Sequence, residues 1–228
     1  MVKLLWKHLT ELIDMKEIAI IGAGGFGREV ACMIRQINVE CPTWDLVGFY
    51  DDDPQLLGTA NPYGKVLGNI DCINSLDRPL SVVIAIGSPS AVSSIVSRIN
   101  NPLIDYPNII APSVIFLDKD SVTIGKGNII GTNSTVSCNV SIGDFNAFNG
   151  YVFIGHDVSV GNCNVIMPSC NVSGGVQMGC RNFMGVKSVV LQYLNIGNDT
   201  RIGAASVVMR NTKDRLLYLG NPAKGIEL

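Results

Sequence analysis

The chain has 228 residues, of which 47% are hydrophobic and only 16% are charged, and its formal net charge is −2. This composition excludes a disordered chain, which would have fewer apolar residues and a larger charge imbalance, and it lacks the basic character of a nucleic-acid-binding domain. The sequence contains neither an apolar run of about 18 residues for a membrane helix nor a secretory signal. We therefore expect a cytoplasmic protein whose partners are neither nucleic acid nor membrane.

The first predicted elements surround a glycine-rich loop. Residues 1–14 form a weakly amphipathic N-terminal extension, to which we assign no function. Residues 17–21 predict a short buried strand that leads into the loop Gly22-Ala-Gly-Gly-Phe-Gly27, and residues 28–35 predict an amphipathic helix. A glycine loop between a strand and a helix is the context in which backbone N–H groups bind phosphate.

Two further strands and a helix follow along the chain. Residues 44–50 predict the second strand, which ends in Asp51-Asp52-Asp53, and residues 81–86 predict another buried strand. A helix begins at Pro89 and extends to about residue 100, because proline is favoured at the first helical position. Alternating strands and helices predict a small, parallel, Rossmann-like α/β domain, which we place at residues 15–105.

A period of six residues fills the second half of the chain. Every sixth residue from Ile124 to Val208 is apolar, at all 15 positions, and the next residue is glycine in nine of them. Six does not match the helical period of 3.6, and each of these glycines would cost an α-helix about 1 kcal/mol. The repeat is typical of a parallel β-helix with three hexads per coil, so it predicts five coils. We place this left-handed β-helix at residues 106–213 and a C-terminal tail at 214–228.

Each hexad predicts one short strand and one corner of the β-helix. The apolar residue fills the axis of the solenoid, and the residue four positions later, which is often small or β-branched, packs inward beside it. The glycine permits either a close approach of two backbones or a positive φ at the corner.

The glycine loop predicts a site for a phosphate-bearing ligand, with Gly22, Gly24 and Gly25 as its contacts. Asp51 follows Gly27 by 24 residues, near the spacing at which an acidic residue contacts a ribose or a base. A complete dinucleotide fold needs two βαβαβ halves, whereas only about 90 residues separate the first strand from the solenoid. A mononucleotide or a nucleotide sugar therefore fits this domain better than NAD. A tight turn without a ligand is the alternative interpretation.

One histidine is a candidate general base. The sequence has only His8 and His156, and only His156 lies in the solenoid, as the third residue of its hexad, where we expect its side chain to point outward. Asp157 follows it, and a carboxylate beside an imidazole suits general-base catalysis, because it orients the ring and stabilises the imidazolium. A solvated surface histidine is the alternative interpretation.

Five segments of the sequence carry a family resemblance. They are the hexads, the opening Ile18–Gly27, the strand end Tyr50–Asp53, the segment from Asn149 to Asp157, and the closing Leu219–Lys224. Together they resemble the hexapeptide-repeat sugar O-/N-acyltransferases of the sialic acid O-acetyltransferase type, a family that includes bacillosamine-pathway and perosamine acetyltransferases. The resemblance covers nearly all of residues 15–228, with the motifs in the family's order.

The resemblance implies an acetyl-CoA-dependent enzyme that acetylates an amino or hydroxyl group of a sugar, without a metal. It implies a homotrimer of left-handed β-helices with active sites between subunits, acetyl-CoA along the coils, and a nucleotide-linked amino sugar held by the N-terminal domain. An O-acetyltransferase acting on sialic acid or another free sugar is the alternative within the family.

The resemblance also assigns roles to individual residues. His156 matches the catalytic base and Asp157 its partner, and Asn149 falls near the acceptor sugar. Gly174 falls where a backbone N–H faces the thioester carbonyl, and two residues fall on the coil edge that lines CoA, namely Gly185 and Val186. The glycine loop, Asp51 and Asp52 fall on the nucleotide-binding positions.

The sequence departs from the family pattern at three positions. Many relatives have a second histidine nine residues after the catalytic one, where this chain has Val165, and a histidine in the glycine loop, where this chain has Phe26. Relatives often have an acidic residue just before the catalytic histidine, where this chain has Gly155. These departures bear on the cofactor contacts and on the identity of the acceptor.

Three functions of other classes compete with this interpretation. The glycine loop alone suggests a nucleotide-dependent oxidoreductase or epimerase, which would leave the solenoid without a role. A zinc enzyme of the γ-carbonic-anhydrase kind needs several histidine ligands, whereas the repeats hold one. A non-catalytic β-helix scaffold is the third alternative.

The seven cysteines form no C-x-x-C pair, and we interpret them as reduced thiols.

Overall fold

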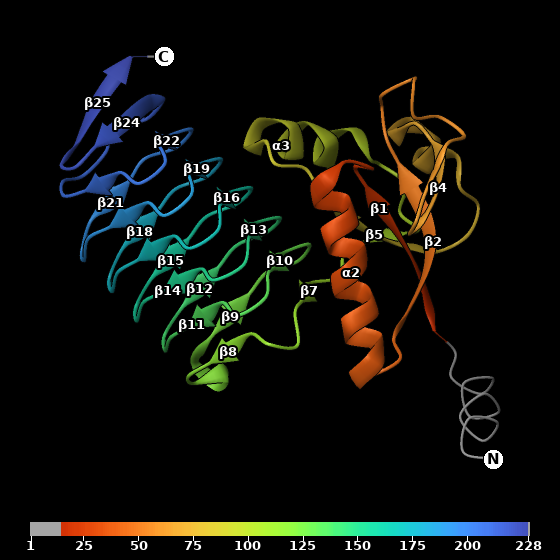
Figure 1. Cartoon of the computed structure of the whole chain (residues 1–228), viewed down its shortest axis with the longest axis horizontal. Coiled ribbons are helices and arrows are strands. Elements are labelled where there is room, and N and C mark those ends of the chain that lie inside the picture. Colours follow the sequence, from red (N-terminus) through yellow and green to blue (C-terminus); the bar gives the residue numbers. More distant parts are fainter. Residues whose placement is uncertain (1–14, 228) are drawn as a thin grey trace.

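The computed structural model describes residues 15–227 and shows an α/β lobe beside a β-helix lobe (Figure 1). The predicted extension at residues 1–14 lies outside the described residues. Within the described part, no helix is both long and apolar enough to cross a membrane.

The α/β lobe contains one six-stranded sheet in the order β3-β4-β2-β1-β5-β6, in which only β3 is antiparallel to its neighbour. Its strands are β1 (Lys16–Ile21), β2 (Trp44–Tyr50), β3 (Ala60–Asn61), β4 (Gly64–Gly68), β5 (Leu80–Ile84) and β6 (Ile104–Asp105). Its helices are α2 (Gly25–Glu40), the 3₁₀ helix η1 (Ile70–Ser75) and α3 (Pro89–Arg98). The predicted Rossmann-like domain is confirmed. Helix α2 is longer at both ends than predicted: it begins within the glycine loop itself and ends at Glu40.

The two faces of this sheet are covered by different helices. In β1, Ile18 and Ile20 pack with the α2 side chains Val30 and Ile34. The alternate residues of the same strand pack on the other face with the apolar side chains of α3 and η1. Because β1, β2 and β5 are parallel, the segments that follow them meet at one edge of the sheet. The glycine loop, Asp51 and the start of α3 therefore lie at the same edge.

The β-helix lobe consists of three parallel sheets, which we call sheets I, II and III. Sheet I contains β7 (Ile109–Ile110), β10 (Ile129–Ile130), β13 (Ala147–Phe148), β16 (Val165–Ile166), β19 (Phe183–Met184), β22 (Arg201–Ile202), β24 (Leu216–Gly220) and the antiparallel β25 (Ala223–Glu227). Sheet II contains β8 (Ile115–Phe116), β11 (Thr135–Val136), β14 (Phe153–Ile154), β17 (Asn171–Val172), β20 (Val189–Val190) and β23 (Val207–Val208). Sheet III contains β9 (Thr123–Ile124), β12 (Ser141–Ile142), β15 (Ser159–Val160), β18 (Gln177–Met178) and β21 (Asn195–Ile196). The predicted β-helix is confirmed.

The strands of successive coils pair with a spacing of 18 residues, as between Ile130 and Phe148. The first coil is longer, because Ile109 pairs with Ile129. Its extra residues lie at the short 3₁₀ turn η2 (Lys119–Ser121). This insertion breaks the hexad phase, which explains why the regular repeat begins only at Ile124 although the β-helix begins at β7.

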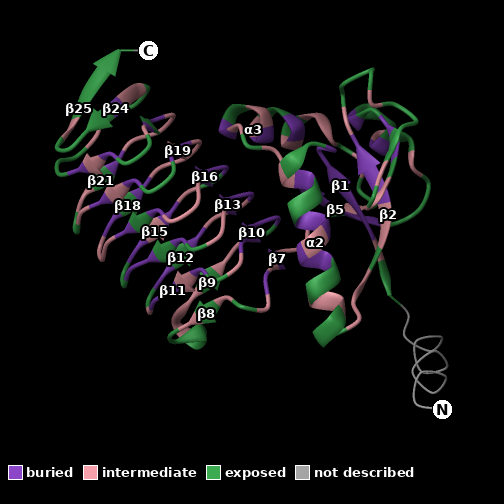
Figure 2. Ribbon diagram, viewed as in Figure 1, coloured by how far each residue is buried: buried purple, intermediate pink, exposed green. Residues whose placement is uncertain are grey.

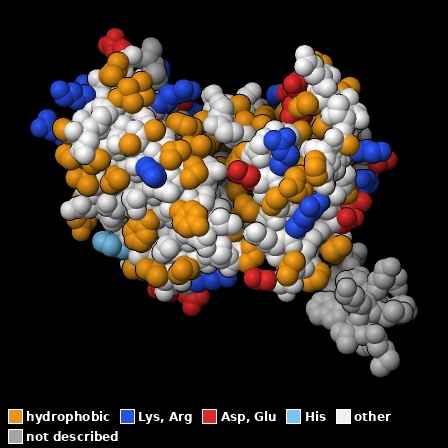
Figure 3. All heavy atoms as spheres, viewed as in Figure 1, with side chains coloured by type: hydrophobic (Ala, Val, Ile, Leu, Met, Phe, Trp, Pro, Cys, Tyr) orange, Lys and Arg blue, Asp and Glu red, His pale blue; other side chains and the backbone are white. Residues whose placement is uncertain are grey.

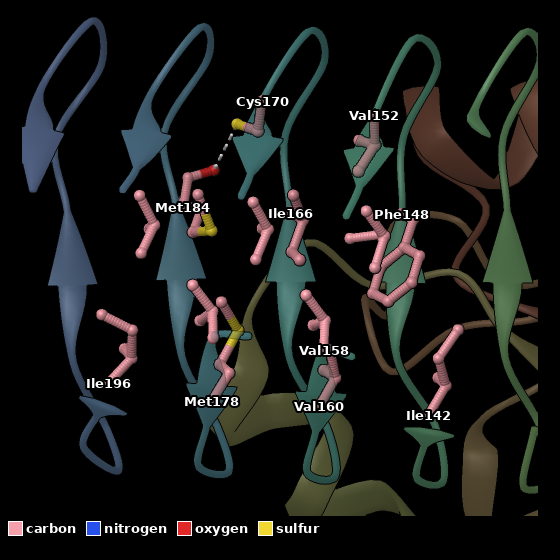
Figure 4. Packing of buried hydrophobic residues seen from close by; sticks show 14 of the residues in the cluster. Ile142, Phe148, Val152, Val158, Val160, Ile166, Cys170, Met178, Met184 and Ile196 are labelled. Atoms are coloured by element: carbon pink, nitrogen blue, oxygen red, sulfur yellow. Dashed lines mark hydrogen bonds between the residues drawn. The ribbon is translucent and has the colours of Figure 1, made fainter. Parts of the chain in front are cut away.

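The hexad positions form the core of the solenoid. Of the 15 positions, Ile124 is half-buried and the other 14 are at most 4% exposed. Buried positions recur in the successive coils of the ribbon (Figure 2). The buried side chains stack along the axis from coil to coil (Figure 4). Full burial of each such side chain contributes about 1.5–3 kcal/mol, so this column is the main source of stability in the lobe.

The hexad glycines are required by close approach between coils rather than by positive φ. A Cβ atom on Gly131 would lie 2.7 Å from the backbone of Asn149 in the next coil. The left-handed backbone conformation instead occurs two residues later in each corner, at residues such as Asn133 (φ 56°) and Tyr151 (φ 62°). Of the two explanations for these glycines, the structure selects close approach.

A ladder of buried asparagines runs along the corner that precedes sheet I. In Asn146 and Asn164, both the backbone N–H and the side-chain amide donate to the Oδ1 atom of the asparagine one coil earlier, at 2.9–3.0 Å. The members of the asparagine ladder are Asn128, Asn146, Asn164 and Asn182, and all are completely or almost completely buried. The ladder satisfies backbone donors that would otherwise be buried without an acceptor.

The two lobes share one apolar core. The outward side chains of sheet I at Ile109, Ile129, Ala147 and Val165 are buried against α2 and its neighbours. This contact fixes helix α2, and therefore the glycine loop at its start, relative to the coils of the β-helix.

Candidate active site

His156 lies at a corner between sheets II and III, directly after β14. Its side chain is 51% exposed, and its Nδ1 atom lies 2.7 Å from Oδ2 of Asp157. Asp157 adopts the left-handed conformation (φ 58°), and its N–H donates to the Cys138 carbonyl of the preceding coil at 3.0 Å. The left-handed turn therefore brings two adjacent side chains together, and it leaves Nε2 of the imidazole free to face a substrate.

Asp157 has a second hydrogen-bond donor that the sequence analysis missed. The Asn139 side-chain amide donates to Oδ1 of Asp157 at 3.1 Å. Hydrogen bonds from His156 and then from Asn139 lower the pKa of Asp157 below its usual value, so this carboxylate stays ionised at neutral pH. Asn139 precedes Asp157 by one coil of 18 residues, and aligning the hexads in columns would have identified it.

Gly174 occupies the same corner one coil later, beside the imidazole ring. A Cβ atom on Gly174 would overlap Nε2 of His156, and a Cβ atom on Gly155 would lie 2.6 Å from the Gly174 backbone nitrogen. Across residues 15–227, the Gly174 N–H has no hydrogen-bond acceptor. The corner thus presents a free backbone donor next to the candidate base. This packing also explains why glycine stands at position 155, where many relatives have an acidic residue.

Asn149 lies at a different corner, between sheets I and II, beside a pocket of about 370 Å³. Helix α2 forms one wall of this pocket with residues that include Phe26 and Glu29, and the β-helix forms the other wall with Thr132, Asn149 and Tyr151. Among its described lining residues, Glu29 alone is charged. The pocket therefore joins the predicted nucleotide-binding lobe to the predicted acceptor residue Asn149.

The predicted CoA-binding residues divide between the two corners. Gly185 and Val186 follow β19 and lie at the corner of Asn149, whereas Gly174 lies at the corner of His156. Gly185 is required by the close approach of Ala204, and Val186 is 38% exposed. One chain does not bring Asn149 and His156 together, because a strand of sheet II separates their corners.

The glycines of the loop have different structural roles. Gly22 has a φ of 102°, and a Cβ atom on it would lie 2.7 Å from the Ala85 carbonyl oxygen. By contrast, Gly24 and Gly25 are exposed, and a Cβ atom on either would meet nothing within 4 Å. Packing does not require glycine at these two positions, which leaves the surface open to a ligand.

The two predicted acidic contacts are engaged within the chain. Asp51 accepts a hydrogen bond from the Ala23 N–H at 2.8 Å and so shapes the loop. Asp52 accepts from the Arg98 guanidinium at 2.6 Å and from the Ile70 N–H at 3.1 Å, and the bond from Arg98 is the main reason that its pKa is lowered. The carboxylate of Asp51 therefore lies beside the loop, whereas that of Asp52 is bound to α3.

The other two departures from the family pattern also contribute to packing. Val165 is 1% exposed in the core between the lobes, and Phe26 is half-buried against the same core. In the described chain, no group of three or more His, Cys, Asp and Glu side chains could hold a metal ion.

Comparisons with known proteins agree with this arrangement. Residues 17–99 match the family model of the PglD N-terminal domain. The chain is 28% identical over 213 residues to GDP-perosamine N-acetyltransferase of Escherichia coli O157:H7. This alignment covers 90% of this chain and 84% of that protein.

Solved structures extend the comparison to nearly the whole chain. The acetyltransferase domain of PglB from Neisseria gonorrhoeae FA1090, in complex with acetyl coenzyme A, is 25% identical with a TM-score of 0.83, and the match covers 93% of this chain and 100% of that one. PerB from Caulobacter crescentus, in complex with CoA and GDP-perosamine, is 27% identical with a TM-score of 0.81, and the match covers 92% and 97% of the two chains.

The α/β lobe and the β-helix of hexapeptide repeats together form the fold of these acetyltransferase structures. The resemblance found in the sequence is confirmed: the chain is similar over most of its length to nucleotide-sugar acetyltransferases, and residues 17–99 match the PglD N-terminal domain.

Proposed function

We propose that this protein transfers the acetyl group of acetyl-CoA to the amino group of a nucleotide-linked sugar, with His156 as general base. The observation that carries the proposal is the geometry at one corner, where His156, its ionised partner Asp157 and the free N–H of Gly174 lie together. The proposal is also supported by the ligands of the similar structures, which are acetyl-CoA in PglB and CoA with GDP-perosamine in PerB.

The mechanism follows from the roles of these three groups. The Nδ1–H of His156 donates to Asp157, which leaves Nε2 to take a proton from the attacking amine. The amine nitrogen bonds to the thioester carbonyl carbon, and the Gly174 N–H donates to the resulting oxyanion. When the tetrahedral intermediate collapses, the C–S bond breaks and the imidazolium returns the proton to the CoA thiolate. No covalent acyl-enzyme is needed.

The acceptor would extend from the glycine loop to the pocket at Asn149. The first turn of α2 has no acidic residue and no side-chain cap, so its N–H groups are available to the diphosphate. Gly24 and Gly25 allow close approach there. The sugar would then lie along α2, where the Glu29 carboxylate can attract its amino group as the ammonium ion before that group loses a proton to water and attacks as the amine. This charge favours an amino sugar over a hydroxyl acceptor.

We propose a homotrimer, because the two halves of the site lie at different corners of each chain. Sheet II and its flanking corners expose large apolar side chains, which need a covering surface. They include Ile115 (54% exposed), Leu117 (63%), Phe153 (40%) and Tyr193 (72%). Packing this face against a second copy would bring the Asn149 corner of one chain to the His156 corner of the next.

We place the reaction in the cytoplasm, where acetyl-CoA and nucleotide sugars meet, in the synthesis of a surface glycan.

An acceptor panel tests the proposed function. Purified protein is incubated with acetyl-CoA and with GDP-, UDP- or dTDP-linked amino sugars, the matching hydroxyl sugars, or free sugars including sialic acid, and thiol release is followed. We expect release with one nucleotide-linked amino sugar and a particle of three times the 24.4 kDa chain mass by light scattering. Turnover of free sugars alone would favour the O-acetyltransferase alternative. Saturable NAD(P)H binding without thiol release would favour the oxidoreductase.

We expect Asp157→Asn to lower kcat by about 10- to 100-fold, because the imidazole loses the carboxylate that fixes its tautomer and stabilises its cation. The measurement is steady-state kcat at saturating substrates. Since the side chain of Asp157 is exposed, the melting temperature should stay unchanged, and Asp144→Asn at another corner provides a control. An unchanged kcat would exclude Asp157 as the partner of the base.

A further inference from the structure

A second pocket, of about 330 Å³, lies between helix α3 and the β-helix lobe. Pro89 and Ser90, in the first turn of α3, form one side of it. The β-helix supplies the rest, namely Arg181, Phe183, Asp199, Arg201 and Arg215. We call this group the arginine pocket. None of its residues lies at the corners of His156 or Asn149.

The arginine pocket carries an excess of positive charge. Arg181 and Asp199 form a two-bond ion pair, with Nε–Oδ1 and Nη2–Oδ2 distances of 2.7 and 2.8 Å. This pair lowers the pKa of Asp199 and neutralises one guanidinium. In residues 15–227, Arg201 and Arg215 have no carboxylate within ion-pair distance. Two guanidinium groups in one cavity therefore remain available to an anion.

The position of the pocket relates it to the predicted nucleotide-binding edge of the α/β lobe. Helix α3 begins at the sheet edge that also carries the glycine loop and Asp51. The corner of Arg181 precedes β19, whereas Gly185 and Val186 follow it, so the strands of sheet I separate the pocket from the corner that holds both Asn149 and these two predicted CoA-binding residues. The space-filling view shows a hollow between the lobes, with Lys or Arg side chains on the β-helix lobe at its upper end (Figure 3).

We propose that the arginine pocket binds a phosphate group of the acceptor's nucleotide, so that both lobes recognise the acceptor. This inference rests on the proposed function. Guanidinium groups form paired, charge-assisted hydrogen bonds with phosphate oxygens, and the Ser90 hydroxyl adds a donor beside them. Phe183 supplies an apolar wall on the same side. The ligand class is a nucleoside diphosphate, either free or linked to a sugar.

The test uses the full-length protein with Arg201→Gln, Arg215→Gln and the double variant. Arg78→Gln is the matched control. Arg78 pairs with Glu17 where β1 and β5 begin, at the opposite end of these strands from the glycine loop and the start of α3. Binding of GDP and of UDP is measured by calorimetry, and KM is measured separately for the nucleotide sugar and for acetyl-CoA. We expect each single variant to raise the nucleotide Kd and the acceptor KM about 10-fold, as for loss of one charge-assisted contact. The KM for acetyl-CoA should stay unchanged.

Two results would overturn the inference. One is an unchanged nucleotide Kd in the double variant, and the other is a rise in KM for acetyl-CoA alone, which would assign the arginines to the CoA phosphates. Nucleotide binding is measured without turnover, so the result does not depend on acetyl transfer. A wild-type protein that acetylates a sugar but binds no nucleoside diphosphate would reject the arginine pocket and leave the catalytic role of His156 intact.

Discussion

Replacing His156 by alanine is expected to lower kcat by about 10³-fold, within the range of 10²- to 10⁴-fold that general-base catalysis supplies. The amine would then have to lose its proton to water as it attacks the thioester, and the leaving thiolate would have no acid nearby. The remaining activity would come from the Gly174 N–H and from the placement of the two substrates. The measurement is acetyl-CoA turnover with the acceptor identified in the panel.

The same variant should leave the protein folded, because the His156 side chain is half exposed and makes its side-chain hydrogen bond only to Asp157 among the described residues. Gln192→Ala is the matched control, since Gln192 is exposed and occupies the same hexad position two coils later. Particle mass, melting temperature and CoA binding should match the wild type in both variants. If turnover survives in His156→Ala, the catalytic assignment fails and the scaffold alternative gains support.

The periodic part of the fold could be predicted from the sequence because each coil repeats the same physical requirement. Every sixth side chain must fill the axis, as at Ile130 and Val136, so the pattern survives without knowledge of any long-range contact. The first coil could not be predicted in this way. Its additional residues at the turn Lys119–Ser121 shift the phase, although Ile109 pairs in the same sheet. A search with a fixed period of six residues misses the strands that precede such an insertion, because their residues are out of phase with the later repeat.

The candidate site was predictable where its parts are close in sequence and not where they meet through the fold. His156 and Asp157 are adjacent, so their pairing could be read directly. Asn149 lies only seven residues before His156, yet a strand of sheet II places it at another corner. No pattern in the sequence predicted the arginine pocket. Arg201 and Arg215 come from different coils without a common period, and they face a helix from the other lobe.

We expect Asn164→Leu to lower the free energy of unfolding by about 2–6 kcal/mol. Oδ1 of Asn164 accepts the Asn182 N–H at 2.8 Å, and its side-chain amide donates to Asn146 at 2.9 Å. Leucine has a similar size but can make neither bond, so one buried N–H is left without an acceptor, at a cost of about 1–3 kcal/mol. Misfit of the branched side chain between coils adds about 1–3 kcal/mol. The measurement is denaturant unfolding at a fixed protein concentration.

Asn195→Leu makes the same substitution on the exposed face of sheet III, where Asn195 forms no side-chain hydrogen bond within residues 15–227. Its stability should change by less than about 0.5 kcal/mol, as for most surface positions. The difference in the free energy of unfolding between the two variants therefore measures what the asparagine ladder contributes, without the general effect of introducing a leucine. Equal losses would mean that the ladder does not hold the coils together. In that case the column of apolar hexad residues would be sufficient to stabilise the solenoid that positions His156 and Gly174.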